Sequence, residues 1–269
     1  MNRAEKILCK VDKTKPGIEI GPSFSPVAPK AEGYDVHIID HLDREGLVAR
    51  YSKQNTQKIE DVDFVWGGES YLELTNKPKY YSWIIASHVI EHTPDLIGFL
   101  LDCDSILQDQ GVISLAIPDK RFCFDHFRPH TGIARLIDAH VCGNKKHSEG
   151  SICEYFLDTA LKGSRINWTQ GYEGEYSLCH NNARAAITNR EKMRNGSFID
   201  LHAWCFTPTS FRLIVRDLYD LGYIELKECA FFPTPLDRAE FYISLSRVGC
   251  GFELPRVEAL KQIRGELAV

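Results

Sequence analysis

Four short apolar segments, each ending in a turn signal, restrict the fold of this chain more than any other feature. They cover residues 17–21, 36–40, 83–87 and 112–117. Between the last two, apolar residues recur at helical spacing from position 96 to position 107, which predicts a helix. Strands joined by such a helix lie parallel in one sheet, because the crossover is right-handed. The first third of the chain therefore predicts an α/β fold with a mostly parallel sheet.

The helix between the third and fourth of these segments has marked ends. Thr93 is predicted to cap its start, Pro94 fits its first position, and Asp95 suits the positive end of the helix dipole. Gln110 and Gly111 are predicted to end it before the next strand.

The last part of the chain follows a different pattern. A Thr-Pro pair at residues 207–208 predicts the start of a helix that Gly222 closes. Strands are predicted over residues 224–232 and 241–248, and their connection is too short for a crossover helix. We therefore expect an antiparallel hairpin that completes the parallel sheet. A final apolar stripe over residues 254–269 predicts a short helix that packs on the domain.

The middle of the chain is rich in His, Asn, Gly and Arg and has only short apolar stretches. We interpret residues 121–205 as a lid-like, substrate-binding insertion over the mouth of the sheet. The predicted organisation is a Rossmann-like core over residues 1–120, this insertion, a return of the core with the last helix and hairpin over residues 206–250, and a helical tail over residues 251–269.

Composition and charge argue against several classes of protein. The net charge of -5 disfavours a nucleic-acid surface, since phosphate-binding domains usually carry a basic excess. The N-terminus lacks the apolar core of a signal peptide, and no run approaches the roughly 20 apolar residues that cross a bilayer. None of the nine cysteines forms a Cys-x-x-Cys pair, which favours reduced thiols. We expect a soluble, cytoplasmic protein without a nucleic-acid partner, and the oligomeric state stays open.

The strongest chemical signal lies at the end of the first strand. Gly21 ends the segment Gly-Ile-Glu-Ile-Gly, and Asp40 ends the next strand. A glycine there lets the backbone approach a ligand, and a carboxylate at the second strand end can accept the hydroxyls of a ribose. Pro22 and Ser23 stand where a dinucleotide site needs glycines, which disfavours a pyrophosphate. Glu19 suits a ligand that carries an ammonium group.

This segment resembles motif I of class I S-adenosylmethionine (SAM)-dependent methyltransferases, in which an acidic residue precedes the glycine turn. Asp40 matches the ribose-binding acid of that family, and residues 87–92 (Ser-His-Val-Ile-Glu-His) resemble the segment after its fourth strand. Gln110-Gly111 resembles the entry to its fifth strand, and the closing hairpin matches its antiparallel seventh strand. The resemblance covers residues 1–120 and 205–250. It implies a SAM cofactor, S-adenosylhomocysteine (SAH) as product, and methyl transfer.

The same resemblance implies roles for individual residues. Glu19 and Gly21 would border the methionine end of SAM, and Asp40 would bind the ribose. Leu42 would flank the adenine, an acid near Asp61 or Asp63 would contact its amino group, and His88 would lie beside the sulfonium. The full set implied for the cofactor is Glu19, Gly21, Pro22, Ser23, Asp40, Leu42, Asp63, Ser87 and His88. Because Pro22 and Ser23 replace a second glycine, the contacts of this loop depart from the family pattern.

More narrowly, residues 19–43 and 88–129 resemble methyltransferases associated with bacterial surface polysaccharide synthesis. The expected reaction is O-methylation of a sugar hydroxyl or a sugar-linked phosphate, with a glycan or small-molecule acceptor. Peripheral association with glycan-assembly enzymes is compatible with it. The alternatives are methylation of another small molecule, a lipid or an amine, a non-catalytic SAM-binding scaffold, and a nicotinamide-dependent oxidoreductase, which Pro22 and Ser23 disfavour.

The insertion supplies candidates for catalysis. An alcohol acceptor needs a base, for which histidine is well tuned near neutral pH, whereas a phosphate needs a cation, preferably arginine. We predict His126 or His202 as the base and Arg128 as the anion-binding residue. The alternative for each loop histidine is a hydrogen-bonded structural role, and for His88 and His92 it is capping of the next helix.

No metal site is predicted, because the chain has neither a cysteine pair nor closely spaced carboxylates. The Asp-x-His pattern at 200–202 and the Asp-His pair at 125–126 leave a divalent ion as the alternative means of acidifying a hydroxyl. Four aromatic residues of the insertion either stack on sugar faces or form a small core under the lid: Trp168, Tyr172, Tyr176 and Trp204.

Overall fold

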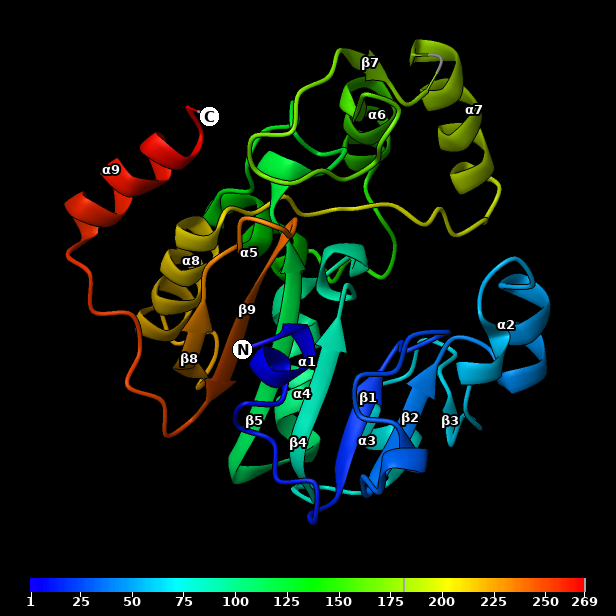
Figure 1. Ribbon diagram of the computed structural model, residues 1–269, viewed down its shortest axis with the longest axis vertical. Coiled ribbons are helices and arrows are strands. Elements are labelled where there is room, and N and C mark those ends of the chain that lie inside the picture. Colours follow the sequence, from blue (N-terminus) through cyan, green and yellow to red (C-terminus); the bar gives the residue numbers. More distant parts are fainter. Residues whose placement is uncertain (181, 269) are drawn as a thin grey trace.

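The structure is a computed structural model that describes residues 1–180 and 182–268. Its centre is a seven-stranded sheet of order β3-β2-β1-β4-β5-β9-β8 (Figure 1). β1 to β5 run parallel, and β9 runs antiparallel to both β5 and β8. The strands are β1 (Gly17–Ile20), β2 (Val36–Asp40), β3 (Phe64–Val65), β4 (Tyr81–Ser87), β5 (Leu107–Pro118), β8 (Lys227–Phe232) and β9 (Glu240–Ser246). The predicted α/β fold and its closing antiparallel hairpin are confirmed.

The strand order places a topological switch between β1 and β4. The chain moves outward from β1 through β2 to β3, then returns to β4 on the other side of β1 and continues to β5. The register pairs Gly17 with Trp83, whose ring is fully buried. A Cβ at Gly17 would lie 2.0 Å from a carbon of that ring, so the close packing of β1 on this indole requires a glycine.

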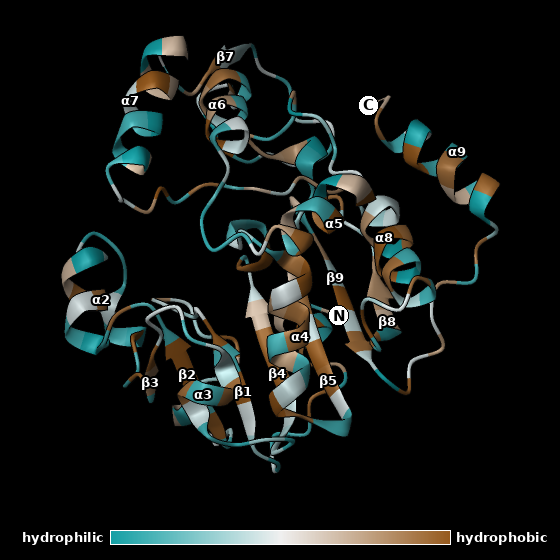
Figure 2. Ribbon diagram, turned by 180° about the vertical axis from the view of Figure 1, so that it is seen from behind, coloured by the Kyte–Doolittle hydropathy of each residue, from teal (hydrophilic) through white to brown (hydrophobic). Residues whose placement is uncertain are grey.

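Four helices cover one face of the sheet, and a short helix with a loop segment covers part of the other (Figures 1 and 2). One face packs against α3 (Tyr71–Thr75), α4 (Leu96–Ile106), α5 (Ile133–Val141) and α8 (Pro208–Asp220). The other face is covered by α1 (Arg3–Ile7) and the segment around Val27 and Ala28. The short helices η1 (Lys30–Glu32), α2 (Arg44–Arg50) and η2 (Thr56–Lys58) belong to the connections on either side of β2. Within the described residues, no helix has the length and apolarity to cross a bilayer.

The segment between β5 and α8 lies beyond the carboxyl ends of the parallel strands (Figure 1). It contains η4 (Lys120–Phe122), α5, α6 (Glu149–Asp158), β6 (Ala160–Lys162), β7 (Tyr176–Leu178) and α7 (Asn182–Arg194). β6 and β7 pair antiparallel in a sheet of their own. The stretch Leu201–Phe206 that follows is entirely buried and leads back under this segment to α8.

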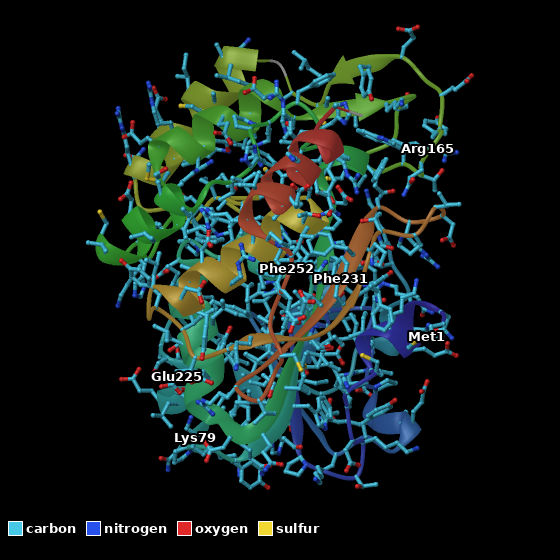
Figure 3. The ribbon with its side chains drawn as sticks, turned by 90° about the vertical axis from the view of Figure 1, so that its left-hand side faces the viewer. Met1, Lys79, Arg165, Glu225, Phe231 and Phe252 are labelled. Atoms are coloured by element: carbon cyan, nitrogen blue, oxygen red, sulfur yellow. The ribbon has the colours of Figure 1, made fainter. Side chains whose placement is uncertain are left out.

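The start of α8 agrees with its prediction, because Thr207 caps it with a capping box and Pro208 is its first residue. Gly222 follows its end with a φ of 77°. The tail forms α9 (Arg256–Glu266), which packs on α8 through Leu213, Phe252, Ala259 and Ile263. Figure 3 labels Phe231 and Phe252, whose rings enclose the Arg212 guanidinium at 4.0 and 4.1 Å.

Three local predictions about α4 were wrong. Pro94 precedes the cap residue Asp95 and is not the first residue of the helix. Thr93 does not cap α4; its hydroxyl donates to the carbonyl of Ile90 and closes a 3-10 turn, η3 (Ile90–His92), while Asp95 caps the helix by accepting from the amide of Gly98. The helix ends at Ile106, and the residues from Leu107 onward already belong to β5. The pattern also did not indicate β3, since a strand of two half-exposed residues carries no periodicity.

Candidate functional site

The carboxyl ends of β1, β2, β4 and β5 meet below the inserted segment (Figure 1). In open α/β sheets, ligands bind at this edge, at the switch point of the strand order. Two of the sequence-predicted cofactor residues lie beside that point: Gly21 directly follows β1, and Asp40 is the last residue of β2.

Gly21 makes the turn that leaves β1. Its φ is 63°, and its amide donates to the carbonyl of Ile39 at 2.8 Å. A Cβ there would lie 3.2 Å from Cγ2 of Val89, which belongs to the turn after β4. The left-handed backbone and the close approach of two strand-end turns both favour glycine. Ser23, with a φ of 47°, extends the left-handed turn.

Asp40 is 3% exposed and lies at the tip of β2. Its Oδ2 accepts from the Ser23 amide at 3.1 Å, and its Oδ1 accepts from the His41 amide at 2.8 Å and contacts His41 Nδ1 at 2.6 Å. The carboxylate is therefore fixed between the β1 turn and the end of β2. A carboxylate held there is suited to accept hydroxyls from a ligand at the switch point.

Glu19 is buried, unlike the partly exposed residues at the mouth of the site. Its buried carboxylate accepts from the amides of Val27 and Ala28 at 2.7 and 3.0 Å, so it holds the loop after Gly21 against the sheet. Burial raises the pKa of Glu19 to about 7, although the two amide donors oppose the shift.

The other predicted cofactor residues are distributed along this edge. Pro22 and Leu42 are partly exposed beside Gly21 and Asp40. Asp63 lies level with Ile38, two residues before the end of β2. Its Oδ2 accepts from the amide of Ile38 and from Lys30 Nζ at 2.7 and 2.6 Å. The residue level with Asp40 on β3 is Val65.

Ser87 and His88 belong to an ion-pair network that starts at the N-terminal helix. Arg3 donates to Ser87 Oγ at 2.6 Å and to Glu240 Oε1 at 2.7 Å. His88, with a φ of 55°, contacts the other oxygen of Glu240 at 2.6 Å through Nε2. Sequence reasoning missed Arg3 and Glu240, since neither belongs to a motif and more than 230 positions separate them.

The charges in this network shift each other's pKa. Burial lowers the pKa of His88, but the nearby carboxylates of Glu240 and Glu91 outweigh it and raise the pKa to about 9. Burial raises the pKa of Glu240, but hydrogen bonds with His88 and Arg3 outweigh it and lower the pKa to about 2. The pair is an ionic contact at the strand ends near neutral pH.

A second cluster, formed by Glu91, His92 and His202, lies between η3 and the buried stretch before α8. One potential ligand atom from each of the three lies within 4.8 Å of the others. The amide of Ala203 donates to the carbonyl of Glu91 at 2.6 Å, which brings His202 to this place. His202 Nδ1 contacts Asp125 Oδ2 at 2.5 Å, and His92 Nδ1 contacts Asp200 Oδ1 at 2.8 Å. The sequence analysis considered Asp125 together with its neighbour His126 as potential metal ligands, whereas in the structure Asp125 contacts His202.

His126 lies in an aromatic group of the inserted segment. Its ring stacks on Tyr176 with centroids 5.1 Å apart, and Trp168 is 5.7 Å away. Its Nδ1 contacts the carbonyl of Arg121 at 2.8 Å. Burial, with the charges of nearby lysines, lowers the pKa of His126.

Arg128 is fully buried, with its guanidinium between two carboxylates. It donates to Asp125 Oδ1 at 2.7 Å and to Glu154 Oε1 at 2.9 Å. In this conformation it neutralises protein acids, and its contact with Asp125 favours a structural role beside His202. Burial raises the pKa of Asp125, but its contacts with His202 and Arg128 outweigh it and lower the pKa to about 2.

A pocket of about 330 Å³ lies next to the Glu91, His92 and His202 cluster. Pro94, Arg135, His147 and Trp204 are among its lining residues. Burial lowers the pKa of His147 to about 4, so its imidazole is neutral near neutral pH. The lining of the pocket therefore combines an aromatic ring, a neutral imidazole and a guanidinium that is paired with Glu154.

No family model matches the chain, and no curated protein matches it. Solved structures similar to it include a SAM-dependent methyltransferase from Aquifex aeolicus (10% identity, 90% of this chain and 88% of that chain, TM-score 0.44) and the CcbJ methyltransferase from Streptomyces caelestis (10% identity, 91% and 96%, TM-score 0.46). A putative Zn-dependent alcohol dehydrogenase from Rhodobacter sphaeroides is similar at 11% identity, 91% and 88% coverage and a TM-score of 0.49. TM-scores below 0.5 do not discriminate between these chemistries.

The strand order is the more specific finding. A parallel sheet with a switch point between β1 and β4, in which antiparallel β9 lies between β5 and β8, is a Rossmann-like class I methyltransferase sheet. The sequence-predicted fold class is thereby confirmed.

Proposed function

We propose that the chain is a SAM-dependent methyltransferase. The observation that carries the proposal is the meeting of the Gly21 turn and the Asp40 carboxylate at the switch point of this sheet. Asp40 would accept the ribose hydroxyls, the Gly21–Ser23 turn would border the methionine end, and Leu42 would flank the adenine. Glu19 supports the site by holding the loop after Gly21.

The transfer itself requires mainly alignment. A lone pair on the acceptor oxygen forms the new O–C bond while the C–S bond breaks, its electron pair returns to sulfur, and SAM becomes SAH. The hydroxyl proton must leave during this step, so a group that lowers its pKa or accepts it is needed. His202, with Asp125 behind it, is better placed than His126 to act near the strand ends, since it lies next to η3.

We further propose a sugar hydroxyl or a sugar-linked phosphate as acceptor, bound by residues 121–205. The resemblance to polysaccharide methyltransferases favours this substrate class. The pocket beside Trp204 supports it, because its lining combines an aromatic residue with several polar and charged side chains. An acceptor panel with labelled SAM would test it: transfer only to amines would contradict the sugar proposal and leave methyl transfer intact.

Cofactor binding is tested by calorimetry with SAH. Removal of the Asp40 carboxylate deletes hydrogen bonds to a charged group, each worth about 1.5–3 kcal/mol. We therefore expect Asp40→Ala to weaken SAH binding on the order of 100-fold. Asp109→Ala is the matched control, because its side chain is 89% exposed and lies at the start of β5, on the edge of the sheet opposite the proposed site. Equal SAH affinity in wild type and Asp40→Ala, or no SAH binding by wild type, would contradict the proposed function.

A further inference from the structure

We propose that Glu91, His92 and His202 bind a divalent transition-metal ion, and that this ion holds and acidifies the acceptor hydroxyl. The catalytic part rests on the proposed methyltransferase function, whereas the metal site itself rests on geometry alone. Two histidines and one carboxylate are a recurrent ligand set for divalent first-row metals, and three protein ligands leave coordination positions for a substrate oxygen.

The Glu91 carboxylate gives the first reason. Glu91 is 1% exposed, and within residues 1–180 and 182–268 neither of its side-chain oxygens has a hydrogen-bond partner. A buried carboxylate without donors is unfavourable unless a cation compensates its charge. His88 Nδ1 and His202 Nε2 approach Oε1 at 3.4 and 3.9 Å, which are distances of ion pairs rather than of hydrogen bonds.

The orientation of the two histidines gives the second reason. His202 uses Nδ1 to contact Asp125, and His92 uses Nδ1 to contact Asp200, so each ring keeps Nε2 for another partner. The ring planes are perpendicular with centroids 4.8 Å apart. Histidines that ligate metals commonly hold their second ring nitrogen against a carboxylate, which fixes the tautomer and strengthens the ligand. Here both histidines have this arrangement around one buried, unpartnered carboxylate.

The position of the cluster explains what the ion would do. Glu91 and His92 are in the turn after β4, three and four residues beyond His88, which the family resemblance predicts to lie beside the sulfonium. The adjacent pocket is lined by Pro94 and Ala203, the immediate neighbours of Thr93 and His202. An ion at the cluster would therefore reach the acceptor side of the methyl group. As a Lewis acid it would lower the pKa of the acceptor hydroxyl, whose proton would pass to solvent.

The competing explanation is charge compensation by protonated histidines. His88, His92 and His202 all face Glu91, and Asp125 and Asp200 face the histidines from the other side. A cluster neutralised in this way needs no ion and would bind none specifically. The two explanations therefore differ in a direct measurement of metal binding.

Co²⁺ is the probe, because its visible absorption reports coordination independently of activity. We expect the chelator-treated full chain to bind one Co²⁺ per chain, with a higher melting temperature when loaded, since an ion that binds the folded state stabilises it. His202→Ala and His92→Ala should each lose this binding. Asp200→Asn should weaken it by about 10- to 100-fold, because it removes the partner of a ligand. The side chains of His92 and Asp200 are partly exposed, so we expect their variants to fold. These variants still test the metal site if His202→Ala does not fold.

The matched control is His140→Ala, because His140 Nδ1 also contacts a carboxylate, Asp95, at 2.9 Å, but among the described residues this pair belongs to no cluster of three potential ligands. This variant should bind Co²⁺ as wild type does. Wild-type affinity in folded His92→Ala or His202→Ala, or no Co²⁺ absorption in wild type, would overturn the metal site. SAH binding by the wild-type protein separates the two proposals. If wild type binds SAH but not Co²⁺, only the metal site is refuted. If it binds Co²⁺ but not SAH, only the proposed function is refuted.

Discussion

Gly21 links backbone conformation to ligand binding at the scale of a single residue. Gly21→Ala would place a side chain on a left-handed backbone and 3.2 Å from Val89, at a cost of about 1–2 kcal/mol. We expect stability to fall by that amount in urea unfolding and SAH affinity to fall about ten-fold, because the turn that borders the ligand must shift. Gly33→Ala is the control: its φ is 85°, but nothing lies within 4 Å of the added Cβ. It should lose stability and keep SAH affinity; equal SAH affinity in both variants would refute a role for the turn.

The start of α8 matters at the scale of an element, because this helix joins the returning chain to the sheet. Thr207 is fully buried and forms a capping box with Ser210. Thr207→Ala should destabilise the protein by about 1–2 kcal/mol, since it leaves a buried helix-end amide without its acceptor. The shift of the urea midpoint measures this loss. Thr207→Ser keeps the hydroxyl and should retain most of the stability; an equal loss in both variants would show that the methyl group, not the cap, is what matters.

The network from Arg3 through Glu240 to His88 connects the two ends of the chain at the scale of the whole molecule. The raised pKa of His88 stabilises the fold fully below its ordinary value of 6.5, and this contribution disappears as pH rises through about 9. The lowered pKa of Glu240 stabilises the fold above its ordinary value of 4.5, and this contribution disappears as pH falls through about 2. We therefore expect the metal-free protein to lose stability between pH 6.5 and 9.

Melting temperatures across this pH range test the prediction. His88→Gln should melt lower than wild type near pH 6, and the difference should shrink towards pH 9, because the variant has no imidazolium to lose. Thr207→Ala, which lowers stability without altering a titratable group, should keep the wild-type pH dependence. A constant difference between His88→Gln and wild type over the whole range would contradict the assigned role of the ion pair.

Local patterns in the sequence determined six of the seven strands of the sheet, the cap of α8, and Gly21 and Asp40 at two strand ends. Such features depend on side-chain periodicity, backbone conformation and turn chemistry, which act over a few residues. The cap of α4 was misassigned because the intervening 3-10 turn, which uses the Thr93 hydroxyl, leaves no distinct local signal.

Only the tertiary structure decided which distant charges meet. Arg3 reaches Glu240 because β9 is inserted beside β5, and His202 reaches Glu91 because a buried stretch is pinned to η3 by the amide of Ala203. In the sequence, His202 and His126 look alike as loop histidines. Their environments differ because burial and carboxylate partners are set by packing between segments far apart in the chain, and packing of that kind leaves no periodicity in either segment.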